Sequence, residues 1–344
     1  MGDMFDWATV RVPLTNAGII NGGSVITIDA LGEVEYATDR RLMVEGSHSA
    51  RISVRGGGDE LVVSGNPAKF LQGHNLFGPS DLAPLMYRTL CAVADKLGLV
   101  PTLSDLAAWR KGNYPLSRLD VTRMIDCGDD ETVKRVLAAV GQVGRKKFQK
   151  GSVFGADTVY VGRGSRRQMM KLYHKADELR VPGHKLPDSL MHQYGTKLLD
   201  YAAGKLRVEV QIGSKWFNEN PTARRAGFWN GDLAASVLNT QLAALEVSDT
   251  MRLPDDITRG LPPKLVLVYE AWRAGHDLRA MYSKSQFYHY RKQLLAYGID
   301  ISQVQLHAVE TEARYIAGFP IRDLLQRPGA GIPDWARGTD LLAS

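Results

Sequence analysis

Cysteine is nearly absent from the sequence. Cys91 and Cys127 are the two cysteines among 344 residues, too few for a disulfide framework. No apolar run approaches the ~20 residues that a helix needs to span a bilayer. The opening residues, MGDMFDWATVRVPL, show no basic segment followed by an apolar core, so the pattern of a secretory signal is missing. We therefore expect a protein of a reducing, cytoplasmic compartment with no membrane partner.

Internal repeats and low-complexity segments are missing too, which excludes solenoids and long compositionally biased tracts. The composition, 44% apolar and 23% charged, is typical of a folded protein, and 344 residues suffice for two or three structural units. The net charge of +6 indicates a nucleic-acid partner only where Lys and Arg gather on one surface. The basic clusters are spread over several segments: Arg145–Lys147, Arg163 with Arg166, Arg167 and Lys171, Arg224–Arg225, and Arg291–Lys292.

Three regions follow from the pattern along the chain. Residues 1–100 contain short β-branched and aromatic runs separated by glycine turns, then a helix that begins near Ser80. Residues 101–213 alternate in the order βαββαβ, which predicts a ferredoxin-like or palm-like core of the α+β class. Residues 214–344 are mainly helical, with a Pro-rich boundary at LPDDITRGLPPK. We expect the first two regions to share one catalytic domain.

The expected strands of the core are LSRLDVTRMI, TVYVG, RQMMKLYHKA and KLRVEVQIG. Side chains alternate across a strand, so residues two apart share a face. One face is apolar, and we expect the helices DDETVKRVLAAVGQV and PDSLMHQYGTKLLDYAAG to cover it. The other, uncovered face collects six polar side chains: Asp120, Glu209, Tyr173, Lys175, Arg118 and Arg207.

This set of side chains suits phosphodiester chemistry. Carboxylates on neighbouring strands, here Asp120 and Glu209, can hold Mg²⁺ or Mn²⁺, which would offset charge on phosphate oxygens. Tyr173 could attack phosphorus as a nucleophile, and nearby cations such as Lys175 would lower its pKa and favour the phenolate. His74, in QGHN, could add one nitrogen ligand. The alternative is ordinary: surface ion pairs, a half-exposed tyrosine and a hydrogen-bonded loop histidine.

Two further segments are candidates for DNA contacts. Arg163, Arg166 and Arg167 lie in the turn before the tyrosine strand, where they could grip phosphates or simply be solvated. In the tail, AWRAGHDLRAMYSKSQFYHYRKQLLAYG predicts either a helix-turn-helix unit or a docked helical bundle. Its candidate contacts are Ser283, Lys284, Gln286, Tyr288, His289, Arg291 and Lys292, and those of the core are Asn75, Lys171, Arg118 and Arg207.

Several of these segments resemble a known family. In order, GNPAKFLQGHNLFGPSDLA, SRLDV, MKLYHKADEL and LRVEVQI resemble the gene II-type replication initiators of filamentous bacteriophages, and FYHYRKQLLAYGID resembles their C-terminal part. The spacing of VYVG and LYHK also resembles plasmid initiators and relaxases of the Rep_trans type. The resemblance spans most of residues 4–213.

The resemblance implies a DNA nicking-closing enzyme that initiates rolling-circle replication. Such an enzyme cuts one strand of a supercoiled origin, stays joined to its 5′ end through tyrosine, leaves a 3′ hydroxyl as primer, and later rejoins the displaced strand. Origin DNA, a host helicase and the host replication machinery are the implied partners. By position, the tyrosine and its lysine fall on Tyr173 and Lys175, and the acidic positions fall on Asp120, Glu209 and Asp6.

The sequence also departs from the wider nicking superfamily. The His-hydrophobic-His metal motif is absent, with HSA and GHN its nearest approaches. Tyr160 competes with Tyr173 as nucleophile, and we favour Tyr173 because it shares its face with Lys171 and Lys175. A conjugative relaxase and a non-catalytic origin-binding regulator remain as alternative functions.

Overall fold

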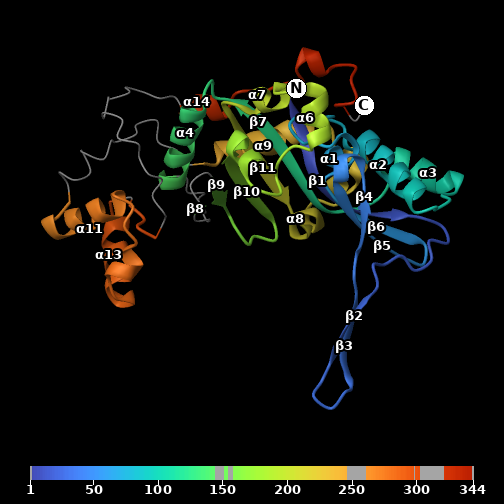
Figure 1. Cartoon of the computed structure of the whole chain (residues 1–344), viewed down its shortest axis with the longest axis horizontal. Helices are drawn as coiled ribbons and strands as arrows, with labels where there is room; N and C mark the ends of the chain where they lie inside the picture. Colours follow the sequence, from blue (N-terminus) through green and yellow to red (C-terminus); the bar gives the residue numbers. More distant parts are fainter. Residues whose placement is uncertain are drawn as a thin grey trace.

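A computed structural model describes residues 2–143, 151–153, 158–245, 261–297, 299–302 and 321–342. Its centre is a nine-stranded antiparallel sheet in the order β4-β5-β6-β1-β7-β11-β10-β9-β8 (Figure 1). The strands are β1 Asp3–Pro13, β4 Leu42–Glu45, β5 Arg51–Gly57, β6 Glu60–Gly65, β7 Leu116–Asp126, β8 Gly151–Val153, β9 Thr158–Val161, β10 Gln168–His174 and β11 Lys205–Ile212.

Apolar residues on alternate positions bury one face of this sheet. Leu206, Val208 and Val210 of β11 are fully buried and belong to one core cluster that also contains residues of the covering helices. Those helices are α2 Leu82–Lys96, α4 Asp130–Val143, α8 Ser214–Glu219 and α9 Gly231–Ala243. Burial of each such aliphatic side chain contributes about 1.5–3 kcal/mol, so the helix-covered face is the main source of stability.

The polar face is covered at one end, which differs from the expectation of a fully open face. Three short helices, α5 Lys175–Arg180, α6 Asp188–Tyr194 and α7 Lys197–Ala202, form a second apolar cluster with Leu76, Phe77 and the C-terminal residues Ala336 and Leu341. Met124, on the polar side of β7, is part of this cluster. The end of the sheet near Met124 is therefore buried, while the rest of this face carries the polar residues.

The α+β class and the βαββαβ succession are confirmed, with differences in detail. The last strand, β11, lies in the middle of the sheet between β7 and β10. The helix expected over PDSLMHQYGTKLLDYAAG is divided at Gly195, which has a φ of +58°. Its two parts, α6 and α7, pack with Met124 on the polar face, so the expectation that this helix covers the apolar face was wrong. The tyrosine strand ends at His174, and Lys175 begins α5, whose first turn holds Asp177 and Glu178. Acidic residues there stabilise a helix N-terminus through its dipole.

A two-stranded arm extends from the N-terminal half (blue in Figure 1). It consists of β2 Ser24–Ile28 and β3 Val34–Asp39, paired antiparallel, and every residue of both strands is exposed. The remaining N-terminal helices, α1 Pro67–Gln72 and α3 Leu103–Arg110, contact β1. The arm therefore adds nothing to the two cores.

The residues after 213 do not form one separate helical unit. Helices α8 and α9 belong to the main core, as do Ile321 and Leu324 of α14 Ile321–Leu325. A third cluster holds α11 Pro263–Arg273, α12 Leu278–Met281 and α13 Lys284–Leu295 together. The chain then returns to β7, where the Ala330 N–H donates to the Met124 carbonyl at 2.6 Å. In the described part of the chain, no helix is long and apolar enough to cross a membrane.

Candidate active site

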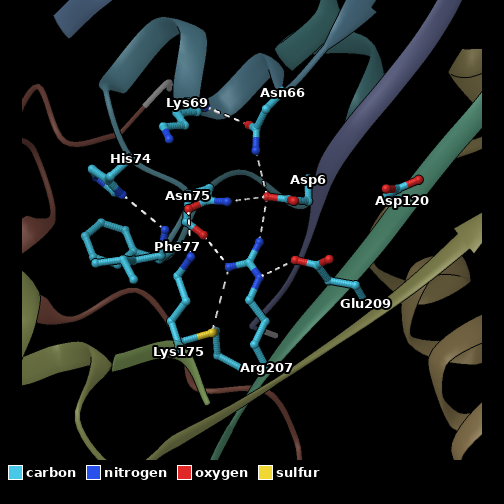
Figure 2. A network of polar contacts seen from close by, with 12 residues as sticks. Asp6, Asn66, Lys69, His74, Asn75, Phe77, Asp120, Lys175, Arg207 and Glu209 are labelled. Carbon is cyan, nitrogen blue, oxygen red and sulfur yellow. Dashed lines mark hydrogen bonds and ion pairs between the residues drawn. The ribbon is translucent and has the colours of Figure 1, made fainter. Parts of the chain in front are cut away.

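The register of three strands brings the polar side chains together. Tyr173 of β10 lies opposite Arg207 of β11, Glu209 lies opposite Thr122 of β7, and Asp120 lies two positions further along β7, opposite Gln211. Directly opposed residues in antiparallel strands share a face. The predicted clustering of Tyr173, Glu209 and Asp120 follows from this register, and Figure 2 shows Asp120 beside Glu209.

Arg207 lies at the centre of the cluster (Figure 2). Its fully buried guanidinium donates from Nε to Glu209 Oε1 at 2.8 Å, from one terminal nitrogen to Asp6 Oδ1 at 2.6 Å, and from the other to the Asn75 carbonyl. Burial disfavours its charge, but the charges of Asp6 and Glu209 outweigh this and raise its pKa. Arg207 therefore organises the site from within and is not free to contact DNA, unlike the sequence-based expectation.

Asp6 reaches this network through an irregularity in β1. The register between β1 and β7 shifts between Phe5 and Trp7, and such bulges re-aim side chains. Its Oδ1 accepts from Arg207, from Asn66 Nδ2 at 2.7 Å and from Asn75 Nδ2 at 2.8 Å. Burial tends to raise the pKa of Asp6, but the nearby cations and amide donors lower it overall. Asp6 is thus held as a carboxylate.

Tyr173 is buried, with 3% of its surface exposed. Its hydroxyl donates to Glu209 Oε1 at 2.6 Å, and Lys171 Nζ lies 3.9 Å from the ring centroid. Burial and the charge of Glu209 raise the pKa of Tyr173 well above 10, although Arg207 opposes this. The expectation that neighbouring cations favour the phenolate was therefore wrong: the phenol is protonated, with a carboxylate in position to accept its proton.

Lys175 supports the loop beside the site. Its fully buried Nζ donates to Glu178 Oε2 at 2.7 Å and to Asn75 Oδ1 at 3.1 Å, and lies 5.9 Å from the Tyr173 ring centroid. Burial and the charge of Arg207 lower its pKa, against the opposing effect of Glu178. Lys175 thus fixes Asn75, whose amide nitrogen and carbonyl oxygen contact Asp6 and Arg207 in turn.

Asp120 occupies the other end of the cluster. Arg118 donates to both of its carboxylate oxygens, at 2.9 and 2.6 Å. Burial raises the pKa of Asp120 to about 6, with Arg118 lowering it and the charges of Glu209 and Asp6 raising it further. The Arg118 guanidinium also lies 5.0 Å from the centroid of the Trp7 ring. Three carboxylates thus lie close enough to repel one another.

The oxygen atoms of the site fit a hard cation in part. All described hydrogen bonds to Asp6 are accepted by Oδ1, and all those to Glu209 are accepted by Oε1. The second oxygen of each carboxylate is therefore available to another ligand. Between them on β7, the buried Thr122 hydroxyl has no hydrogen-bond partner in the described structure. In the described part of the chain, no group of three or more His, Cys, Asp or Glu side chains lies close enough together to hold a metal ion. Mg²⁺ is commonly bound by one or two carboxylates plus substrate phosphates, so the donors suit a cation that DNA helps to hold.

His74 faces away from the carboxylates. Its Nε2 lies 3.1 Å from the Leu341 carbonyl, its Nδ1 accepts from the Leu76 N–H at 3.3 Å, and its ring packs against Phe77. Burial lowers its pKa to about 3, so it is neutral with the proton on Nε2. Both ring nitrogens are used, and the structure gives no support to His74 as a metal ligand.

The arginine turn lies at the Asp120 end of the sheet. Arg163, Arg166 and Arg167 are exposed before Gln168, the first residue of β10, and Tyr173 follows about 17 Å further along the strand. Arg163 stacks on Tyr160 at 5.4 Å, and Arg167 pairs with Glu219 at 3.1 Å. Arginines of this turn could contact a DNA segment that flanks the site, but they lie too far from Tyr173 to contact it.

Tyr160 lies opposite Lys171 and so shares the polar face with Tyr173. In the tail, Lys284 and Lys292 of α13 are exposed. Arg291, in contrast, donates to Asp300 from Nε at 2.6 Å and from one terminal nitrogen at 2.7 Å. The sequence reasoning missed Asn66 and Trp7, and it placed Thr122 on the polar face without giving it a role. Asn66 had one readable signal, its position as N-cap before Pro67.

Comparison with known proteins agrees with the predicted resemblance. The family described as "Replication-associated protein G2P N-terminal" matches residues 4–231, and "Replication-associated protein G2P C-terminal" matches residues 264–335. G2P of Enterobacteria phage I2-2 is 29% identical over 313 residues, covering 87% of this chain and 88% of that protein. G2P of Salmonella phage IKe is 28% identical over 214 residues, 54% of this chain and 49% of that protein.

Among solved structures, a rolling circle replication initiator protein from Geobacillus stearothermophilus aligns with a TM-score of 0.33 and 13% identity, covering 74% of this chain and 88% of that one. The sequence relatives carry the assignment. Because the N-terminal family matches more than half of the chain, this chain belongs to the family of replication-associated proteins G2P.

Proposed function

We propose that this protein initiates rolling-circle replication by nicking one strand of supercoiled origin DNA through Tyr173. The observation that supports this most directly is the 2.6 Å hydrogen bond from the Tyr173 hydroxyl to Glu209, with Arg207 bridging Glu209 and Asp6. A buried phenol paired with a carboxylate has its proton acceptor in place. Family membership adds the expectation of a replication function.

The proposed reaction is a transesterification. Tyr173 passes its proton to Glu209 as its oxygen attacks the phosphorus of the scissile phosphate. A bond forms between phosphorus and the tyrosine oxygen, the bond to the 3′ oxygen breaks, and that oxygen takes a proton from water. The phosphodiester energy is kept in the tyrosine ester, so the reverse reaction with another 3′ hydroxyl rejoins a strand.

The remaining residues would hold the substrate and its charge. Arg207 keeps Glu209 and Asp6 oriented, and Lys171, 3.9 Å from the Tyr173 ring centroid, can approach a phosphate that contacts the phenol. Glu209 and Asp6, whose second carboxylate oxygens accept no described hydrogen bond, would hold Mg²⁺ or Mn²⁺ together with the Thr122 hydroxyl and with Asp120, the acidic residue expected from the sequence. The cation would supply charge neutralisation at the phosphate oxygens. The side chains of Asp6 and Glu209 are 13% and 14% exposed, and this is the side from which DNA would reach the buried phenol.

Origin DNA is the partner that this chemistry requires, and a host helicase and polymerase would act on the nicked product. The exposed Lys284 and Lys292 of α13, and the arginine turn before β10, would contact the duplex or single strand outside the site. These would be contacts to phosphates, which position the DNA but do not recognise its base sequence.

The test is incubation of the protein with supercoiled DNA carrying the replicon's origin and Mg²⁺. We expect open circles whose 5′ ends carry a protease-sensitive adduct. Tyr173→Phe should lose the adduct and keep origin binding, while Tyr160→Phe, on the same face, should keep both. An adduct that persists in Tyr173→Phe would refute the assignment of the nucleophile, and origin binding without nicking by the wild type would favour a non-catalytic regulator.

A further inference from the structure

A cavity of about 760 Å³ opens beside Asp6 and is not needed for the steps above. Its walls come from β1, from the turn η1 Ser47–Ser49 with the start of β5, from the N-terminal half of α1, and from the segment before α6. The side chains that line it include Trp7, His48, Arg51, Asn66, Lys69 and Lys185.

The cavity adjoins the carboxylates directly. Trp7 is the residue after Asp6 and lies opposite Asp120 in the sheet. Asn66 lines the cavity and donates its amide to Asp6 Oδ1 at 2.7 Å. A strand whose phosphate lies at Glu209 and Asp6 would therefore place a neighbouring nucleotide at the mouth of this cavity.

The lining suits a nucleotide. Trp7 is partly exposed, its orientation is fixed by the hydrogen bond from Nε1 to Ser64 at 3.2 Å, and Arg118 lies 5.0 Å from its ring centroid. Aromatic side chains held in this way bind nucleic-acid bases by stacking. Lys69 and Lys185 form no ion pair with any described carboxylate, while Arg51 pairs with Glu45 at 3.4 Å. Asp188 is the one acidic residue of the lining.

The turn that closes the cavity is strained. His48 and Ser49 have positive φ angles of 52° and 60°, which non-glycine residues adopt rarely and mostly at functional positions. The turn is held by close packing on α1, since a Cβ on Gly73 would lie 2.5 Å from the His48 ring. His48 Nδ1 also lies 2.6 Å from Ser189 Oγ. This rigid wall keeps the cavity open between α1 and α6.

We propose that this cavity, the Trp7 pocket, binds one nucleotide of the single strand next to the scissile phosphate. The base lies against Trp7, and its phosphate lies between Lys69 and Lys185. The inference rests on the proposed function for its place in the reaction, but binding in the pocket can be measured without nicking.

The probe is a twelve-nucleotide oligothymidylate, measured by fluorescence anisotropy with the full chain. We expect Trp7→Leu to weaken binding by about fivefold or more, the loss typical of one stacked base. The double variant Lys69→Ser/Lys185→Ser should weaken binding by about tenfold and, because one phosphate loses its contacts, reduce the slope of log affinity against log salt by about 0.7. Both lysines are at the surface of the pocket, so this variant should fold even if Trp7→Leu does not.

The matched control is Lys96→Ser/Lys111→Ser, which removes the same charge from exposed positions at the ends of α2 and α3, helices that pack into the main core. If the control weakens binding as much as the pocket variant, the effect is one of overall charge and the proposal is refuted. Light-induced crosslinking of an oligomer with one 5-iododeoxyuridine should map to the tryptic peptide of Trp7. A crosslink confined to α13 or the arginine turn would also refute it.

The proposed nicking activity and the proposed nucleotide pocket can be refuted independently of each other. Loss of binding in the pocket variants with no nicking by the wild type would keep the nucleotide pocket and reject the nickase. Nicking that depends on Tyr173 with unchanged oligonucleotide binding in the pocket variants would keep the nickase and reject the pocket.

Discussion

The Tyr173 hydroxyl donates to Oε1 of Glu209, the same oxygen that accepts from Arg207 Nε, at 2.6 and 2.8 Å respectively. One carboxylate oxygen therefore connects the phenol on β10 with the guanidinium on β11. Arg207 orients Glu209 and offsets its charge, while Glu209 stays able to take the phenol proton. In the proposed reaction, this relationship would make Glu209 the proton acceptor in addition to its expected role as a metal ligand.

Replacement of Glu209 by glutamine tests the role of proton acceptor. An amide keeps the shape of the side chain but cannot accept the proton of Tyr173, so we expect the rate of adduct formation to fall by about 10²-fold or more. Single-turnover cleavage of a radiolabelled origin oligonucleotide would measure this. Binding of the uncut DNA serves as the control and should change little. A rate within threefold of the wild type would show that Glu209 is not the proton acceptor.

Asp120 should make stability depend on pH in an unusual direction. Burial raises its pKa from 3.8 to about 6, so the folded state binds a proton more tightly than the unfolded state. The contribution of Asp120 to the free energy of unfolding therefore falls as pH rises from about 4 to about 6, by about 3 kcal/mol at most. Asp120→Asn removes this penalty. We expect the stability of Asp120→Asn relative to the wild type to increase over that interval in urea titrations.

The sign of this change is the critical result, because the loss of the Arg118 pair adds an offset that does not depend strongly on pH. A relative stability that stays flat between about pH 4 and about pH 7 would show that Asp120 titrates normally. Manganese binding, followed by electron paramagnetic resonance with an uncut oligonucleotide present, gives a second readout. It should weaken in Asp120→Asn if this residue holds the cation.

Much of the site could be predicted from alternation along the strands. Asp120, Glu209 and Tyr173 share a face because each lies in a regular strand, where parity fixes direction. Asp6 could not be placed in this way, because it lies at an irregularity in β1 that only the pairing with β7 reveals. The pKa of Tyr173 was wrongly expected to fall, because the burial of its face depends on α5 to α7 and on the C-terminal residues.

The environment of His74 could not be predicted from the sequence either, because its hydrogen-bond partner Leu341 lies 267 residues away along the chain. We expect His74→Leu to cost about 3 kcal/mol at neutral pH, because the Leu341 carbonyl and the Leu76 N–H lose their partner. Manganese binding and nicking by the folded fraction should be unchanged. Loss of metal binding in a folded His74→Leu protein would show instead that the histidine is a ligand.

The lowered pKa of His74 gives a further test with the opposite sign to Asp120. Its pKa is about 3 in the folded protein and 6.5 when exposed, so the unfolded state binds the proton first as pH falls. Its contribution to stability is complete above about pH 6.5 and falls by about 2 kcal/mol by about pH 4.5. The wild type should lose this amount relative to His74→Leu over that interval, and parallel pH profiles for the two proteins would refute it.

The arm formed by β2 and β3 should be dispensable for folding. All its residues are exposed, including Ile26, Ile28 and Tyr36, and an isolated hairpin is marginally stable in water. Replacement of residues 24–39 by a short Gly-Ser linker should therefore leave the midpoint of thermal unfolding within a few degrees of the wild type. As a matched control, Val10→Ala in the buried part of β1 should lower it clearly. A large fall on removal of the arm would mean that its apolar side chains are covered in solution, by this chain or by a second copy of it.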